Sequence, residues 1–451
     1  MDAMTAVPPA AAVAPWPSRR RANWVLAVLI VAFAFSFLDR VILTMLIVPI
    51  QRDLALTDVQ LALLHGFAFA VFYALAGFPL GRLADRVSRK RLIAAGVAAW
   101  SLFTAGCGLA KGFYSLFFAR VGVGVGEAAL SPAAFSLLSD YFPPERRARA
   151  IATYQLGAIG GSGIAYVLGG LVIAFASSGG LIAVPLLGGM APWQVTFLIV
   201  GLPGLAVALL VLTLKEPVRR ESMARARRPR GQLRAWLRTN ARTMICFVFG
   251  FSAINVSFNA LIAWGPTWLM RVHDLPPAKI GLLLGAAMLL AGGGGQLLGA
   301  WRSDRLLARG RTTAVFDTGL ACALILIPLS VATLVPGAMT AVLLVAAVLF
   351  FGCAAIGHAP SLIGQIAPNE LRGQVAAIFL CAMNIIGAGV GSFTVALLTQ
   401  HVFGDPKMVG ASIGITAAIG AGIGAILIWS GRDALAQSAA RLARSVKEYE
   451  G

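Results

Sequence analysis

The sequence predicts an all-α membrane protein whose twelve transmembrane helices form two pseudo-symmetric six-helix bundles. Its 451 residues are 59% hydrophobic and only 12% charged, and the mean hydropathy of +0.83 lies outside the range of soluble globular chains. Apolar runs long enough to cross a bilayer recur from Trp24 to Trp429. Two charged motifs also recur in the two halves at similar spacing, which indicates a duplicated six-helix unit.

The expected spans follow one another along the chain, separated by short polar or Gly/Pro-containing loops. The first six are 24–48, 60–84, 91–110, 114–141, 148–174 and 195–214, and the last six are 243–270, 278–301, 313–335, 338–361, 374–400 and 409–430. The boundary between the ninth and tenth spans, around Pro336-Gly337, is the one that the hydrophobic pattern marks least clearly. The resulting domains are a tail (1–23), a first bundle (24–214), a basic linker (215–242), a second bundle (243–430) and a second tail (431–451).

Basic residues are concentrated in alternate loops of this chain, whose net charge is +19. One set of loops carries Arg19–Arg21, the cluster from Arg82 to Arg91, the linker and the C-terminal tail. Positive charge concentrates in the cytoplasmic loops of membrane proteins. We therefore expect both termini to lie in the cytoplasm and the protein to reside in a bacterial-type inner membrane. The charge then marks topology and contact with anionic membrane lipids, and does not indicate nucleic-acid binding. Around Gln232–Arg242 the linker is either an amphipathic helix on lipid headgroups or a solvated tether.

Neither the terminal segments nor the cysteines suggest a reactive or metal-binding site. Residues 1–17 are rich in Ala and Pro and lack a signal-peptide layout, and Arg19–Arg21 lead directly into a full-length span. The five cysteines lie in apolar segments without close pairs, as is typical of reduced core residues. We therefore expect neither a metal nor a cofactor, and we expect a monomer.

The segment from Arg120 to Pro132 places an arginine and a carboxylate deep inside an apolar span. Arg120 and Glu127 are seven residues apart and so share one stripe of a helix. Three glycines at positions 122, 124 and 126 should let a neighbouring helix approach closely. Charges at membrane depth are costly, and they usually face a partner or a water-filled cavity.

A second charged pair, Asp39-Arg40, falls at a similar depth in the first span. Asp39 lies ~22 Å along its helix at 1.5 Å per residue, near the middle of the bilayer. Burial favours a protonated carboxyl, whereas a nearby arginine favours the ionised form, and a group between these influences can load and release a proton. We expect Glu127, and then Asp39, to carry the proton, with Arg120 and Arg40 as charge partners. The alternative is two static buried ion pairs.

The loop after the second span predicts a charge latch between helices. It combines Gly81, Asp85, Arg86 and Arg89, and a shorter version with Asp304 and Arg305 ends the eighth span. Asp85 can accept hydrogen bonds at a helix N-terminus, while the arginines bind carbonyls or lipid phosphates. Such a latch would form and break as the cytoplasmic side closes and opens. A second motif is repeated between the halves: Pro143-Pro-Glu145-Arg146 in the first corresponds to Pro368-Asn-Glu370-Leu-Arg372 in the second.

These motifs resemble those of the major facilitator superfamily along the whole chain. The loop at Gly81 is similar to the Gly-x-x-x-Asp-Arg-x-Gly-Arg-Arg/Lys signature between helices two and three, with Ser88 in place of its second glycine. The glycine-rich face beside Arg120 is similar to the helix-four motif of proton-linked exporters, although Glu127 stands where a small residue is more usual. Gly157 to Gly163 resemble the antiporter motif of helix five, but Ser162 replaces its proline, which weighs against antiport.

Within the superfamily the first half resembles the spinster family. The similar stretches are Phe37-Leu-Asp39-Arg40, Gly126-Glu127-Ala128 and Ser139-Asp140-Tyr-Phe-Pro143. This resemblance implies a twelve-helix transporter, and the family is associated with export of sphingosine-type lipids and lysophospholipids.

The remaining polar residues in the spans are candidates for a substrate cavity. They are Tyr73 and Tyr154 in the first half and Asn255, Asn259, His358 and Asn384 in the second. Each could instead be an ordinary packing or hydrogen-bonding residue. A charged first half that faces a largely apolar second half suits an amphipathic substrate, whose anionic headgroup Arg40 or Arg120 could hold.

The preferred function is therefore proton-coupled transport of a lysolipid or sphingoid-like molecule. A multidrug/proton antiporter and a transporter of small organic anions are the alternatives. An enzyme would need a nucleophile with a base or a metal cluster, and the four scattered histidines provide neither. A channel would not need duplicated latches.

Overall fold

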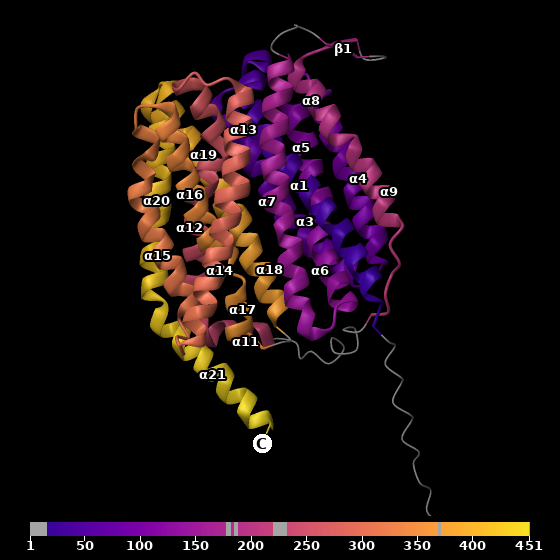
Figure 1. Cartoon of the computed structure of the whole chain (residues 1–451), viewed down its shortest axis with the longest axis vertical. Helices are drawn as coiled ribbons and strands as arrows, with labels where there is room; N and C mark the ends of the chain where they lie inside the picture. The colour runs from indigo at the N-terminus through magenta and orange to yellow at the C-terminus, as the bar shows by residue number, and fades with distance from the viewer. Residues whose placement is uncertain (1–15, 177–181, 185–187, 220–231, 369–370, 451) are drawn as a thin grey trace, which may run out of the picture.

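The computed structural model describes residues 16–176, 182–184, 188–219, 232–368 and 371–450. Figure 1 shows two helical bundles side by side, the first half of the chain in indigo to magenta and the second in orange to yellow. The first half contains α1 (Arg19–Leu54), α2 (Asp58–Ala62), η1 (Leu63–Phe67), α3 (Ala68–Ala84), α4 (Arg89–Cys107), α5 (Phe113–Glu127), α6 (Leu130–Tyr141), α7 (Pro144–Ala176), α8 (Pro192–Gly201) and α9 (Pro203–Leu212). A short hairpin of β1 (Ile182–Val184) and β2 (Gly188–Met190), which the sequence did not predict, precedes α8.

The second half repeats this arrangement after a short helix, α11 (Gln232–Thr239). It contains α12 (Ala241–Val272), α13 (Pro277–Ala287), η2 (Met288–Gly292), α14 (Gly293–Ala308), α15 (Ala314–Leu329), η3 (Ser330–Leu334), α16 (Ala338–Gly357), α17 (Ser361–Ile366), α18 (Arg372–Ala382), η4 (Met383–Val390), α19 (Gly391–Leu397), η5 (Leu398–Phe403), η6 (Pro406–Met408), α20 (Val409–Ser430) and α21 (Arg432–Glu450). The π-helical turns η1, η2 and η4 interrupt longer helices, and η5 ends one.

The helical segments coincide with all twelve predicted spans. Among the described residues, eleven segments are long and apolar enough to cross a membrane. The remaining predicted span, the third in the chain, corresponds to α4, which has 19 residues and begins with three basic ones, so that its apolar stretch is shorter. The uncertain split between spans nine and ten falls at Pro336-Gly337, as expected. Gly337 has a φ of +104°, a conformation that favours glycine, directly before α16.

The two ends of the molecule differ in what they carry. Because consecutive spans alternate in direction, the start of α1, the α3–α4 loop, α11 and α21 lie at one end, which we call the basic end (Figure 1). The hairpin and the α1–α2 connection lie at the opposite end. Closely packed glycines join the bundles: a Cβ on Gly66 would lie 2.9 Å from Ala388 O, and one on Gly285 would lie 2.8 Å from Gly163 O.

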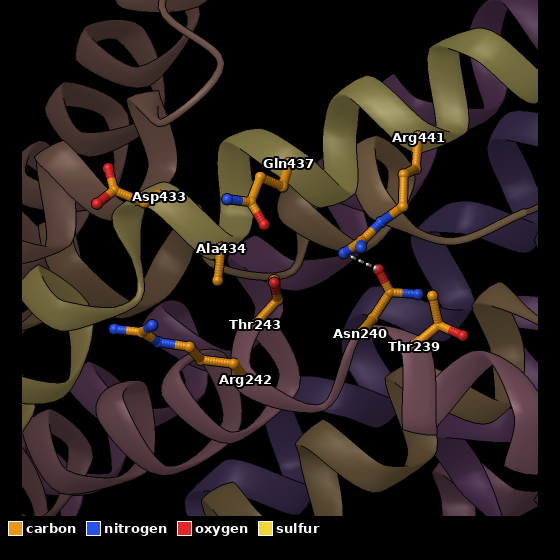
Figure 2. A pocket seen from close by; sticks show the side chains of 8 residues that line it. All are labelled: Thr239, Asn240, Arg242, Thr243, Asp433, Ala434, Gln437 and Arg441. Carbon is orange, nitrogen blue, oxygen red and sulfur yellow. Dashed lines mark hydrogen bonds between the residues drawn. The ribbon is translucent and has the colours of Figure 1, made fainter.

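Residues after 430 were expected to be a tail, but they form α21, which packs against the second bundle. Leu435 and Ser438 are almost fully buried, and Thr243 on α12 hydrogen-bonds to Ser438 at 2.8 Å. Figure 2 shows the small pocket, about 150 Å³, between α12 and α21, where Arg441 donates to Asn240 Oδ1 at 3.3 Å. The predicted tail is therefore a docked helix, because a short buried stripe on a mostly polar helix is enough to hold it against the second bundle.

Candidate functional site

The four predicted coupling residues come from two helices of the first bundle. Asp39 and Arg40 lie near the middle of α1, and Arg120 and Glu127 lie on α5, which ends at Glu127. Asp39, Arg120 and Glu127 are each only 1% exposed, whereas the Arg40 side chain is 19% exposed. The span is interrupted after Glu127, at Ala128 and Ala129, before α6 begins. Three nearly inaccessible charged groups and one accessible arginine therefore meet within the first bundle.

Arg40 and Glu127 form a direct ion pair between α1 and α5. The Nη2 and Nε atoms of Arg40 lie 2.6 Å and 2.7 Å from Glu127 Oε2. The Ser36 hydroxyl, one turn before Arg40, donates to the same oxygen at 2.7 Å. Glu127 Oε1 is buried and has no hydrogen-bond partner. One carboxylate oxygen is thus fully bonded, and the other can accept a proton or a hydrogen bond.

Arg120 does not occupy the place that the sequence suggested. It was expected as the charge partner of Glu127, but its Nη1 donates to the main-chain oxygen of Asp39 at 3.3 Å, and its Nε is buried without a partner. Seven residues separate Arg120 from Glu127, ~10.5 Å along a helix axis, which is too far for a direct pair. The Asp39 carboxylate accepts from Thr104 at 3.2 Å through Oδ2, and its Oδ1 has no partner.

Aromatic rings surround the Arg40 guanidinium. Its carbon lies 4.8 Å from the Phe37 ring centre, 4.5 Å from that of Phe69 and 4.9 Å from that of Tyr73. Aromatic faces attract cations, and the attraction is stronger where water is excluded. Arg40 can therefore remain a stable cation even when Glu127 is neutral.

The glycines of α5 bring this helix close to its neighbours, as the sequence predicted. A Cβ on Gly124 would lie 2.9 Å from the main-chain oxygen of Phe69, and a Cβ on Gly126 would lie 2.8 Å from the main-chain nitrogen of Trp100. Both distances are shorter than real Cβ contacts. The glycines consequently allow Phe69 to approach both α5 and the Arg40 side chain.

Sequence reasoning missed Ser36 and Thr104, and it gave Phe37 no role of its own although this residue belongs to the spinster-like stretch. Ser36 could have been found, because it precedes Arg40 by four residues and so lies on the same face of α1. Thr104 carried no signal among the many small residues of the spans.

The predicted cavity residues divide into two groups. Tyr73 contacts Arg40 and its hydroxyl lies 3.5 Å from that of Ser131, while Tyr154 stacks on Phe33 at 4.4 Å with its hydroxyl buried and unpartnered. The second-half residues serve as links between or within helices. The bonds run from Asn255 to Met383 O (2.9 Å), from Asn259 to Asn255 Oδ1 (2.8 Å), from Asn384 to Leu380 O (2.8 Å), and from the His358 ring to Ala354 O (2.7 Å) and Val315 O (3.1 Å).

Arg89 is the centre of the predicted latch at the basic end. It is 1% exposed and begins α4, and its guanidinium bonds to Asp140 at the end of α6. Its Nε also bonds to Glu216 beyond α9 at 2.7 Å. Arg219 donates to the main-chain oxygens of Ala84 (3.0 Å), Asp85 and Val87 (2.5 Å) at the end of α3. Four spans of the first bundle are therefore connected through arginines.

The pKa of Glu216 is lowered by this network. Partial burial is the largest influence and raises the pKa, but hydrogen bonds from Arg89, from Ser88 Oγ (2.8 Å) and from the Lys90 main-chain N–H (3.2 Å) outweigh it. Glu216 therefore stays ionised at neutral pH.

The other latch residues are placed differently. Gly81 lies at the end of α3 in ordinary contact with Pro132, and Asp85 and Arg86 are exposed in the loop. In the second half, Asp304 and Arg305 are exposed on α14, and Arg305 lies over the Trp301 ring at 5.2 Å.

In the second half, Asp317 in the first turn of α15 accepts from Arg432 at 2.8 Å and from Thr313 at 2.9 Å, and its side chain is 9% exposed. Glu370, which the sequence matched with Glu145, lies outside the described residues.

Comparison with known proteins gives consistent matches. The sequence profile of the Major Facilitator Superfamily matches residues 28–392. An MFS-type efflux pump of Mycolicibacterium smegmatis is 27% identical over 91% of this chain and 92% of its own length. Protein spinster of Drosophila melanogaster is 25% identical over 90% of this chain, which spans only 64% of that protein. The crystal structure of a bacterial homologue of the human lysosomal transporter Spinster, inward-facing and unoccupied, superposes with a TM-score of 0.75, 25% identity, and coverage of 94% of this chain and 98% of that one.

Proposed function

Because this chain belongs to the major facilitator superfamily and is thus a membrane transporter of small molecules, we propose that it couples proton movement to transport of an amphipathic lipid. The expected substrate is of the lysophospholipid or sphingoid type, and transport proceeds by alternating access. The observation that carries the proposal is the Arg40–Glu127 pair, with its unpartnered Glu127 Oε1. A static ion pair would be poorly stabilising at this depth, and charges there are usually functional.

Glu127 is the proposed proton carrier. A proton on Oε1 neutralises the carboxylate, which removes its attraction for Arg40. Arg40 then remains among its aromatic rings with free donors that can bind an anion. Asp39 is the second proposed proton carrier, because its Oδ1 has no hydrogen-bond partner. Arg120 donates to the main-chain oxygen of the same residue.

The ionised and the protonated forms of Glu127 favour substrates with different headgroups. A phosphate-bearing substrate would bind Arg40 after Glu127 is protonated, so that proton and substrate move together. A cationic sphingoid amine would instead pair with ionised Glu127, so that substrate and proton exchange. Arg120, whose Nε has no partner, is a second candidate for a headgroup phosphate.

A lipid-like substrate agrees with the distribution of polar groups. The ionised residues of the site all come from the first bundle, while the second-half candidates Asn255 and His358 are bonded to main-chain oxygens. Similarity to spinster proteins supports the same choice. The efflux pump of Mycolicibacterium smegmatis supports the alternative, a multidrug/proton antiporter, and the third candidate substrate, a small organic anion, would bind the partly exposed Arg40.

Orientation and assembly are also part of the proposal. Positive charge gathers at the basic end, so we place this end and both termini in the cytoplasm and the protein in a bacterial-type inner membrane. The Arg89 network would then be the cytoplasmic latch. We take the transporter to act as a monomer.

The test is substrate-induced proton flux in proteoliposomes with a labelled lysophospholipid or sphingoid base. We expect Glu127→Gln to abolish coupled proton flux and Asp39→Asn to reduce it. Glu145→Gln, which removes an exposed carboxylate at the start of α7, serves as the matched control. Lipid transport that ignores both site variants would overturn the coupling mechanism. Competition by unrelated cationic drugs, but not by lipids, would favour the multidrug alternative.

A further inference from the structure

The polar pocket at the basic end, between the start of α12 and α21, has the lining of an anion site. Its volume is about 150 Å³. The polar side chains that argue for a ligand are Thr239, Arg242 and Thr243 at the α11–α12 junction and Asp433, Gln437 and Arg441 of α21. Among the described residues that line it, two are arginines and one is a carboxylate. Arginine is well suited to bind phosphate, so this lining favours a phosphate-bearing ligand.

Both arginines of the pocket keep hydrogen-bond donors available. Arg441 uses one nitrogen, Nη2, for its bonds to Asn240 Oδ1 at 3.3 Å and Ser438 Oγ at 3.1 Å. Arg242 also uses Nη2, which donates to Ser430 O at 3.0 Å. Within the part of the chain that the structure describes, the remaining nitrogens of these two exposed residues bond to no other residue. Each guanidinium can therefore still donate to a phosphate oxygen.

The carboxylate of the pocket lies away from Arg441. Asp433 precedes Arg441 by eight residues on α21, ~12 Å along the helix axis at 1.5 Å per residue. Figure 2 shows the two residues on opposite sides of the pocket, with Gln437 between them. Gln437 lies one turn before Arg441, on the same face of the helix. We therefore expect a phosphate beside Arg441, where the Gln437 amide can donate a further hydrogen bond.

Exposed tryptophans indicate where the membrane surface lies at the basic end. Trp24 on α1, Trp301 on α14 and Trp429 on α20 are all more than half exposed. Tryptophan is enriched where the hydrocarbon of a bilayer meets the lipid headgroups. Trp429 precedes Asp433 by only four residues. The pocket therefore lies at the level of the lipid headgroups.

We propose that the pocket between α12 and α21 binds the phosphate group of an anionic membrane phospholipid. The surrounding charge favours a lipid over a free anion, because anionic headgroups attract clusters of basic side chains near a membrane surface. Arg234 and Arg238 of α11 and Arg444 of α21 are exposed and add to this cluster. A bound headgroup would contact α12 and α21 together and so help to hold α21 on the second bundle. The site requires neither proton coupling nor a particular substrate.

The short helix α11 keeps its arginines close to this site. Its apolar residues Leu233, Trp236 and Leu237 pack against the hydrophobic core, and its last residue, Thr239, lines the pocket. The positive charge beside the pocket is therefore carried by a docked helix.

The test is lipid binding by the full-length protein in detergent, measured by native mass spectrometry. The added ligands are phosphatidylglycerol, phosphatidylcholine and, as a competitor, inorganic phosphate. We expect phosphatidylglycerol to bind more tightly than phosphatidylcholine. Arg441→Gln should weaken the binding of phosphatidylglycerol about tenfold, the effect of losing one charge-assisted hydrogen bond. Arg242→Gln should weaken it by a smaller factor, because Asp433 lies away from the expected phosphate position beside Arg441.

Two further variants make the result specific. Gln437→Glu keeps both arginines but places a carboxylate where it competes with the phosphate for Arg441, so it should weaken binding by a similar factor. Arg309→Gln is the matched control, because it changes the net charge by the same amount at an exposed position at the end of α14, outside the pocket. It should bind phosphatidylglycerol as the wild type does.

Three outcomes would overturn the lipid site. The first is phosphatidylglycerol binding by Arg441→Gln and Gln437→Glu that equals binding by Arg309→Gln. The second is equal binding of phosphatidylglycerol and phosphatidylcholine by the wild type. The third is inorganic phosphate that displaces phosphatidylglycerol at equal concentration, which would assign the pocket to a free anion. If Arg441→Gln does not fold, the comparison of Gln437→Glu with Arg309→Gln decides.

Discussion

Ser36→Ala is the smallest change that tests whether Glu127 carries the proton. The Ser36 hydroxyl donates to Glu127 Oε2 at 2.7 Å in a buried position. A hydrogen bond to a charged group contributes about 1.5–3 kcal/mol, and its loss weakens the ionised form without changing any charge. At about 1.4 kcal/mol per factor of ten, the protonated form gains roughly 10–100-fold. The pH at which proton-coupled uptake is half-maximal should therefore move upward, by about one to two units.

The assay is the pH profile of uptake into proteoliposomes for the wild type and Ser36→Ala. Arg40 continues to favour the ionised form in both proteins, so the shift isolates the hydroxyl. Ser101→Ala is the matched control, because Ser101 is equally buried in the first bundle and its hydroxyl has no partner. A Ser36→Ala profile that coincides with the control would refute the role of Glu127. A shift towards lower pH would refute the reasoning about sign.

Two further predictions concern packing and the basic end. Gly124→Ala should lower the thermal unfolding midpoint, because the new Cβ meets Phe69 O and overpacking costs about 1–3 kcal/mol. Gly160→Ala should leave the midpoint unchanged, because a Cβ there meets no atom within 4 Å. Equal midpoints for the two variants would contradict the close approach of α5 to Phe69. The lowered pKa of Glu216 makes its stabilising contribution complete above the usual glutamate pKa and lost as pH falls through the lowered value. The difference in unfolding midpoint between the wild type and Glu216→Gln should therefore disappear in acid, and a difference that grew in acid would contradict this sign.

The spans were predictable because their signal is local. A run of apolar residues of bilayer length predicts a helix wherever it lies in the chain. The common depth of Asp39 and Glu127 followed from the same arithmetic, since both lie near the middle of their spans. Gly124 was predictable because a small residue has a direct physical meaning where helices meet.

The pairing of the charges was not predictable from spacing alone. Arg120 and Glu127 share a stripe of α5, but the choice of Arg40 depends on how α1 is rotated and how far it lies from α5. Arg271 bonds to Asp58 and Gln51, which precede it by 213 and 220 positions, and all three read in the sequence as ordinary loop residues. The docking of α21 was hidden by its charged composition, in which Ala434, Leu435 and Ser438 form only a short buried stripe.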